Sequence, residues 1–104
     1  MIRKAFVMSV KPGSEAEHEK RHNPIWPELR SALKEHGILS YSIFRNPATH
    51  QLFAYVELED ETRWDALARS PVCQRWYAYM KDIMIANSDG SPALTPMPVS
   101  LFYK

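Results

Sequence analysis

Residues 38–58, ILSYSIFRNPATHQLFAYVEL, decide the fold, because they contain two strand patterns separated by a turn sequence. The first pattern covers Ile38–Arg45 and the second covers Leu52–Leu58. Both are rich in the aromatic and branched residues typical of strands. Asn46–His50 lies between them and contains Asn and Pro, which favour a turn. The stretch therefore predicts a β-hairpin.

The second strand of this hairpin is apolar on both sides. Phe53 and Tyr55 lie on one side, and the other side carries Leu52, Ala54 and Val56. A small sheet with two apolar faces usually covers the second face with a partner. We therefore expect a homodimer that packs sheet against sheet. The alternative is an outer face that carries a few exposed aromatic residues.

The residues before the hairpin predict a strand and a broken helix. Ile2–Val10 alternates like a half-buried strand. Ser14 and Glu17 fit a capping box that starts a helix running to about His22. An Asn-Pro pair interrupts this helix, which continues over 27–36 until Gly37 ends it.

The residues after the hairpin predict two helices and a last strand. Asp60 caps a helix through Leu67, and a second helix runs from Ser70 to about Met84. Residues 87–98 are expected to form a loop, and Val99–Tyr103 the last strand. The order β-α-β-β-α-β is the ferredoxin-like plan of the α+β class, with helices on one face of an antiparallel sheet. A chain of 104 residues fits one such domain, 1–104.

Composition excludes several classes of protein. Thirteen Lys and Arg against twelve Asp and Glu leave a net charge of +1 without a basic block, so a nucleic-acid partner is not expected. The lone Cys73 cannot form an internal disulfide, which suits a reducing compartment. The opening residues MIRKAFVMSV form neither a signal peptide nor a membrane span. We therefore expect a cytoplasmic protein without a membrane partner.

The string HEKRH, residues 18–22, matches the HExxH pattern of zinc enzymes. Lys20 and Arg21 at its middle positions repel a divalent cation. The helix end at His22 favours the imidazolium form over a neutral ligand. No spacing identifies a third ligand, so we predict that the protein binds no metal.

The same position favours His22 as a proton donor. Histidine titrates near neutral pH, and a helix C-terminus stabilises its charged form. The alternative is an ordinary solvated histidine on a polar helix. The surrounding RHNPIWPEL, residues 21–29, favours a functional site, because a proline-broken junction turns polar groups toward the open end of the sheet.

Trp76 and Tyr77 form a second candidate cluster within VCQRWYAYMKDIM, residues 72–84. Most of this helix is expected to be a core stripe. Adjacent aromatic residues point about 100° apart on a helix, and both rarely bury fully. One can fill the core while the other lines a pocket. Aromatic faces stack on sugars, and His, Asn and Tyr bind hydroxyls, so the combination predicts a small carbohydrate site.

The segments MIRKAFVMSV, RHNPIWPEL and VCQRWYAYM closely resemble the L-rhamnose mutarotase family, and the similarity covers nearly the whole chain. The resemblance implies a dimeric ferredoxin-like fold of the dimeric α/β-barrel type. It also implies an enzyme without metal or cofactor that interconverts the α and β anomers of L-rhamnose or a similar 6-deoxyhexose.

The resemblance also implies roles for five residues. The proton-donating histidine falls on His22, and the sugar-contacting tyrosine and tryptophan fall on Tyr41 and Trp76. His18 stands where a substrate-contacting tyrosine is usual, and Tyr77 where a second tryptophan is usual. A histidine can still bind a hydroxyl and a tyrosine keeps an aromatic face, so both are expected to bind substrate. Tyr41, His18 and a held water are the candidates for the base.

Two other functions fit the predicted architecture. Small dimeric ferredoxin-like barrels include cofactor-free monooxygenases and haem-handling proteins, and fold alone does not separate them from a mutarotase. A non-catalytic sugar-binding module is the third possibility. Oxygen consumption or haem absorbance tests the first alternative, and binding without anomer exchange tests the second.

Overall fold

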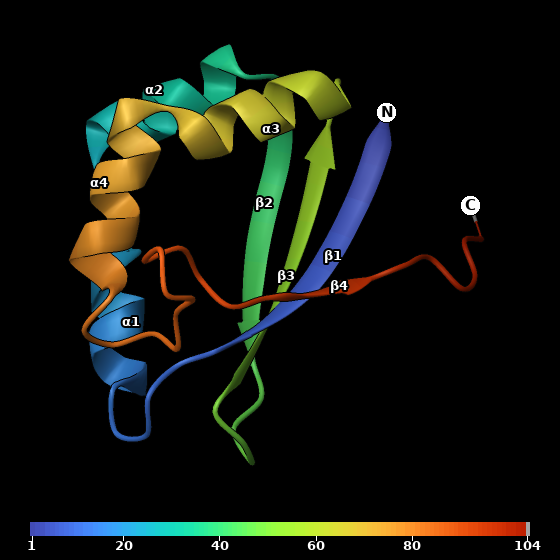
Figure 1. The fold of residues 1–104 in the computed structure, drawn as a ribbon. Helices are drawn as coiled ribbons and strands as arrows, with labels where there is room; N and C mark the ends of the chain where they lie inside the picture. The colour runs from blue at the N-terminus through green and yellow to red at the C-terminus, as the bar shows by residue number, and fades with distance from the viewer. Residues whose placement is uncertain (104) are drawn as a thin grey trace.

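The computed structural model describes residues 1–103 and shows a four-stranded antiparallel sheet with its helices on one side (Figure 1). The elements in chain order are β1 (Ile2–Ser9), α1 (Glu15–Arg21), α2 (Pro27–Glu35), β2 (Ile38–Arg45), β3 (Gln51–Leu58), α3 (Glu61–Arg69), α4 (Pro71–Met80) and β4 (Thr95–Met97). The strand order is β2-β3-β1-β4. The predicted ferredoxin-like α+β fold is confirmed.

The alternation of β3 determines which face of the sheet is the core. The side chains that face the helices are 2% exposed or less: Leu52, Ala54, Val56 and Leu58. On β1, Phe6 pairs with Ala54 and Met8 pairs with Leu52, so both strands present the same face to the helices. The hairpin prediction therefore holds in both its strands and its faces.

The opposite face of the sheet is exposed and partly apolar. Phe44 of β2 is 63% exposed, Phe53 of β3 is 38% exposed and Met97 of β4 is 46% exposed. The two phenylalanines are directly paired across β2 and β3. This is the second apolar face that the alternation of β3 predicts.

Helix starts follow the predicted caps in two of three cases. The Asp60 carboxylate accepts hydrogen bonds from the backbone N–H groups of Thr62 and Arg63, at 2.7 and 3.3 Å. Ser70 also caps its helix with its hydroxyl oxygen. The predicted capping box at Ser14 is wrong, because the Ser14 side chain makes no cap hydrogen bond. Its expected partner, Glu17, instead forms an ion pair with Arg21, one turn further along α1.

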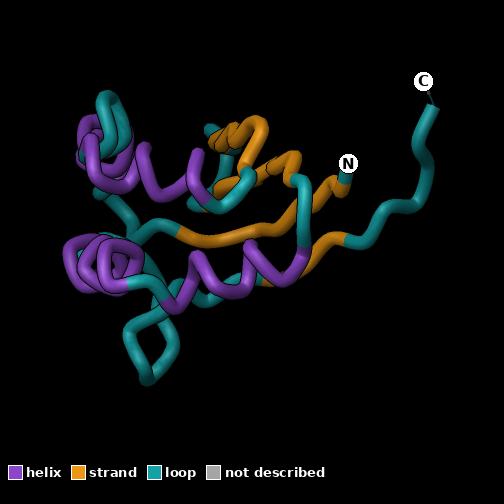
Figure 2. The backbone as a smooth tube through the Cα atoms, turned by 90° about the horizontal axis from the view of Figure 1, so that it is seen from above, coloured by secondary structure: helices purple, strands orange, loops and turns teal. Residues whose placement is uncertain are grey.

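The C-terminal part differs most from the sequence prediction. The last strand is Thr95–Met97, within the predicted loop, and residues 99–103 form no strand. Pro96 lies within this strand and Pro98 follows it. These prolines are tolerated because the strand lies at the edge of the sheet and needs ladder partners on one side only. Helix α4 also ends at Met80, because Met84 pairs with Val10 in an isolated bridge. After β4 the chain extends beyond the helical layer toward the side where the N-terminus lies (Figure 2), and the Phe102 ring meets the Arg3 guanidinium of β1 at 3.9 Å.

Within residues 1–103 no helix has the length and the apolar character that are needed to cross a membrane.

Candidate active site

A cavity of about 870 Å³ lies between the helices and the core face of the sheet. All five residues singled out from the sequence line it: His18, His22, Tyr41, Trp76 and Tyr77. They come from α1 and its C-cap, β2 and α4, so three separate segments of the chain meet here. We identify this cavity as the candidate active site.

The His22 ring is held on two sides at the end of α1. Its Nδ1 donates a hydrogen bond of 2.8 Å to the carbonyl oxygen of His18, one turn earlier. A carbonyl oxygen only accepts, so Nδ1 carries a proton and Nε2 is the nitrogen available to a ligand in the cavity. The ring also meets Trp76 edge-to-face, with centroids 5.2 Å apart. His22 is therefore fixed in both orientation and tautomer.

Burial makes both histidines of this site weaker bases than an exposed histidine. It lowers the pKa of His22 below 6.5, although the hydrogen bond to the His18 carbonyl acts in the opposite direction. Burial, together with a positive charge on His22, lowers the pKa of His18 to about 4. The sequence predicts that the helix end keeps His22 partly protonated, whereas burial acts in the opposite direction. The lowered pKa values favour the neutral form of both rings.

The two tyrosines of the cavity are hydroxyl donors. Burial raises the pKa of Tyr41 well above its usual range, although 37% of the residue is exposed, because its hydroxyl is desolvated. Burial also raises the pKa of Tyr77, and the neighbouring Cys73 thiol adds to the effect. Both phenols therefore remain protonated and can donate to a sugar oxygen. The raised pKa of Tyr41 disfavours its phenolate as the base near neutral pH.

Trp76 is at once a core residue and a wall of the cavity. It is only 9% exposed and belongs to the main hydrophobic cluster, as the predicted core stripe requires. Trp26 holds its ring at a right angle, with centroids 5.0 Å apart. Tyr77 is partly buried against the same cluster. The expected division, one ring in the core and one in a pocket, is replaced by two rings that both line the cavity.

The HEKRH string does not adopt the geometry of a zinc site. The rings of His18 and His22 are stacked, with centroids 4.1 Å apart and planes inclined by 28°. In the part of the chain that the structure describes, no three His, Cys, Asp or Glu side chains lie together as a metal site would require.

Several cavity residues had not been singled out from the sequence. They include Arg30, Arg45, Trp64 and Leu94. Arg45 could have been found, because it alternates with Tyr41 on β2 and so shares its face. Leu94 could not, because only the tertiary fold brings the segment between α4 and β4 against this cavity.

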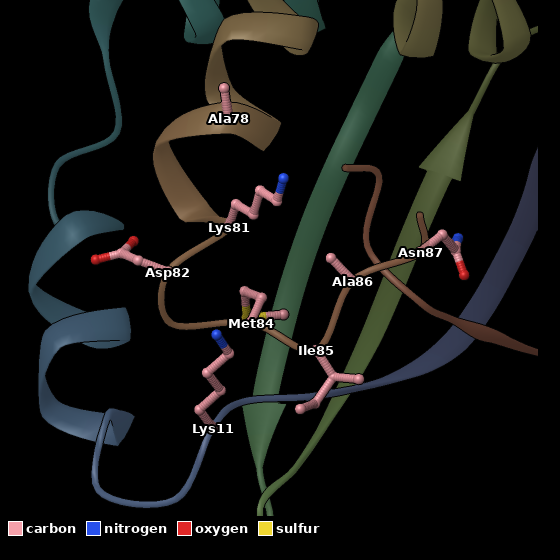
Figure 3. A pocket seen from close by; sticks show the side chains of 8 residues that line it. All are labelled: Lys11, Ala78, Lys81, Asp82, Met84, Ile85, Ala86 and Asn87. Atoms are coloured by element: carbon pink, nitrogen blue, oxygen red, sulfur yellow. The ribbon is translucent and has the colours of Figure 1, made fainter. Parts of the chain in front are cut away.

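A second hollow, of about 650 Å³, lies beyond the C-terminal end of α4 (Figure 3). Its lining residues include Lys11, Lys81, Met84 and Asn87, and no histidine or aromatic residue. The Asp82 carboxylate points away from this hollow toward α1 (Figure 3). Because this hollow is open and its lining offers neither a histidine nor an aromatic wall, the larger cavity is the better candidate for chemistry.

The fold and the cavity define a small ferredoxin-like protein whose site combines a neutral histidine, tyrosine hydroxyls and a tryptophan wall. A family model described as "L-rhamnose mutarotase" matches residues 3–102. The chain belongs to the L-rhamnose mutarotase family.

Individual relatives agree with this assignment. The L-rhamnose mutarotase of Opitutus terrae is 63% identical over 92 residues, which are 88% of each chain. That of Tolumonas auensis is 57% identical over 103 residues, covering 99% of this chain and 98% of the relative. The crystal structure of the L-rhamnose mutarotase FA22100 of Formosa agariphila matches both chains in full, with a TM-score of 0.91 and 33% identity.

More distant structures share the fold alone. A putative antibiotic biosynthesis monooxygenase of Bordetella bronchiseptica has a TM-score of 0.69 at 16% sequence identity. It covers 95% of this chain. This similarity extends to the sheet and helices and carries no information on the chemistry of the site.

Proposed function

We propose that this chain interconverts the α and β anomers of L-rhamnose and that His22 carries the proton transfer. Membership of the L-rhamnose mutarotase family supports the reaction. The observation that carries the mechanism is the neutral His22 ring, whose Nδ1–H is bound to the His18 carbonyl and whose Nε2 is free to act.

Ring opening begins with His22 as a base. Nε2 takes the proton of the anomeric hydroxyl, a C=O bond forms at C1, and the bond between C1 and the ring oxygen breaks. The electron pair of that bond stays on the ring oxygen, which takes a proton from a donor in the cavity. Tyr41, Tyr77 or a bound water can supply this proton, because both phenols are protonated before the reaction, and the donor takes the proton back when the ring closes.

Ring closure reverses these steps. The open aldehyde rotates about its C1–C2 bond and presents the other carbonyl face to the hydroxyl that will close the ring. The imidazolium of His22 then returns its proton to the anomeric oxygen, so the same residue is base in opening and acid in closure. The sequence assigns His22 the acid role in opening; its lowered pKa favours the reverse order.

The remaining site residues bind the sugar in this proposal. Trp76 offers an indole wall for the apolar face of the ring, and Tyr41 and Tyr77 donate to its hydroxyls. His18 is neutral above a pH of about 4 and lies one turn from His22, so it can accept or donate to a further hydroxyl. No cofactor is needed, because sugars already mutarotate in water.

Magnetisation exchange between the two anomeric protons of L-rhamnose tests the proposal. Purified protein at micromolar concentration in dilute buffer should raise the exchange rate above that of buffer alone. L-Fucose and other 6-deoxyhexoses define the sugar range. Sugar signals that report saturable binding without faster exchange would refute the mutarotase and support a binding module instead.

We further propose that the active form is a homodimer joined through the outer face of the sheet. The support is the exposed apolar surface at Phe44, Phe53 and Met97. Light scattering should give about twice the monomer mass, and Phe44→Asp should lower that mass. A wild-type monomer at micromolar concentration would refute the proposal. The buried, unpaired thiol of Cys73 supports a reducing, cytoplasmic location.

A further inference from the structure

Arg21, the last residue of α1, joins this helix to the end of α4. Its Nη1 donates to the carbonyl oxygen of Tyr79 at 2.7 Å and to Asp82 Oδ1 at 2.9 Å. Its Nη2 donates to Asp82 Oδ2 at 3.1 Å, which completes a two-pronged ion pair. Its Nε donates to Glu17 at 3.2 Å. Three of its nitrogen atoms therefore have defined partners on two helical segments.

The surroundings of Arg21 distinguish it from an ordinary surface arginine. Only 11% of its side chain is exposed, and the guanidinium carbon lies 4.5 Å from the ring centroid of Tyr79. A planar guanidinium that binds a carboxylate with two parallel hydrogen bonds gains both energy and geometric definition. The contact is thus suited to fixing a position.

The position that it fixes is that of His22. The next residue after Arg21 is His22, and the partner that His22 meets edge-to-face is Trp76 on α4. The side chains of His22 and Asn23 bind carbonyl oxygens of the last turn of α1, at 2.8 Å each, but these local bonds do not fix that turn relative to α4. A tie between that turn and the end of α4 therefore sets the distance between the proton-transfer ring and the tryptophan wall.

We propose that Arg21 is a positioning residue for the reaction, acting through His22 by clamping α1 to the Tyr79–Asp82 end of α4. This inference rests on the proposed role of His22. Arg21 is not among the residues that line the cavity, so it does not reach the sugar itself. Figure 3 shows the Asp82 carboxylate turned toward α1, as the clamp requires.

The first test measures kcat and KM for anomer exchange in Arg21→Met and Asp82→Ala. Asp82 is 65% exposed, so its replacement leaves the fold intact even where the Arg21 variant is less stable. We expect kcat to fall about tenfold to 10²-fold in both variants, with KM within about threefold, since an error near 1 Å in placement costs about that much. The double variant should lose little more than Arg21→Met alone.

A matched control uses the other ion pair that reaches α4. Arg75 of α4 pairs with Glu28 of α2 at 2.6 Å, but the two side chains are 56% and 74% exposed and neither lines the cavity. Glu28→Gln should leave kcat and KM at wild-type values, because exposed pairs contribute little. Equal losses in the control and in Asp82→Ala would overturn the proposal.

A second measurement does not depend on catalysis. Long-range ¹H–¹⁵N spectra of the histidine rings should show the Nδ1–H tautomer of His22 in the wild type and in Glu28→Gln. In Asp82→Ala the His22 signals should shift or broaden. Unchanged His22 signals in Asp82→Ala, or a rise in KM with kcat intact, would overturn the proposal. If the wild type fails to catalyse exchange, the proposed function is refuted. The spectra would still show whether the contact of Arg21 with Asp82 positions the His22 ring.

Discussion

The replacement His22→Asn tests the proposed proton transfer while preserving the local structure. The asparagine amide can donate to the His18 carbonyl, as Nδ1 does now at 2.8 Å. It has no group that can take and return a proton in place of Nε2. The variant should therefore bind sugar with nearly unchanged affinity and lose the exchange reaction.

The expected loss in rate follows from the role assigned to the ring. A positioned acid/base contributes about 10²- to 10⁴-fold, or about 3 to 5 kcal/mol of the activation barrier. The variant also loses two ring contacts, the stack on His18 at 4.1 Å and the edge contact with Trp76 at 5.2 Å. Such pairs contribute about 0.5 to 1.5 kcal/mol each, so we expect the unfolding free energy to fall by about 1 to 3 kcal/mol.

The chain offers a matched control for this variant. The Nδ1 of His36 binds the carbonyl oxygen of Ala32 at 2.7 Å, the same one-turn arrangement at the end of α2. His36 does not line the cavity. His36→Asn should therefore keep the full rate of anomer exchange in the same NMR assay. A His22→Asn variant that is as active as this control would refute the proposed role of His22.

The pH profile of the wild type provides an independent check. Because the pKa of His22 is lowered, the neutral ring persists through neutral pH, and kcat/KM should be flat there. The rate should fall as the pH drops through a midpoint below 6.5, where His22 takes up a proton. A rate that instead rises on acidification would show that the imidazolium, and not the neutral ring, starts the reaction.

Three further predictions concern stability, binding and metal. The pKa of His18 is 6.5 in an unfolded chain and about 4 in the folded protein, so between these pH values only the unfolded chain binds a proton on His18. The unfolding free energy should therefore fall as the pH drops through this window. Urea unfolding should show a smaller fall in His18→Tyr, and an equal fall would contradict the assignment. Tyr41→Phe should raise KM about 3- to 10-fold by removing one hydroxyl contact, with a smaller effect on kcat. Trp76→Phe is the variant that tests the tryptophan wall of the cavity. Trp76→Ala is less suitable, because it would remove a core side chain and cost about 3 to 5 kcal/mol of stability. Exchange should survive EDTA, and elemental analysis that finds about one zinc per chain would reopen the HExxH interpretation.

Local chemistry in the sequence was enough to predict most of the fold. The alternation of Leu52–Leu58 assigns one face of β3 to the core, and every even-numbered side chain of that stretch is buried. Asp60 caps its helix, and Gly37 ends α2 with a φ of +75°. These features depend on neighbours along the chain, which is why residue type and spacing suffice to predict them.

The five candidate site residues were also found from the sequence, through residue type and family resemblance. Their meeting in one cavity could be checked only in the structure, because three separate segments supply them. Arg45 escaped notice although it shares a strand face with Tyr41. Leu94 escaped because no local pattern places the segment after α4 against the cavity.

Charge states and long-range pairings were decided by the tertiary structure alone. The sequence places His22 at a helix end, which favours its charged form, but burial lowers its pKa instead. The sequence predicts the last strand over Val99–Tyr103, but the edge of β1 is taken by Thr95–Met97. Desolvation and strand pairing both depend on which distant segments surround a residue. The sequence by itself therefore determined the elements, the core face and the candidate residues, and only the fold decided the burial of His22 and the pairing of the last strand.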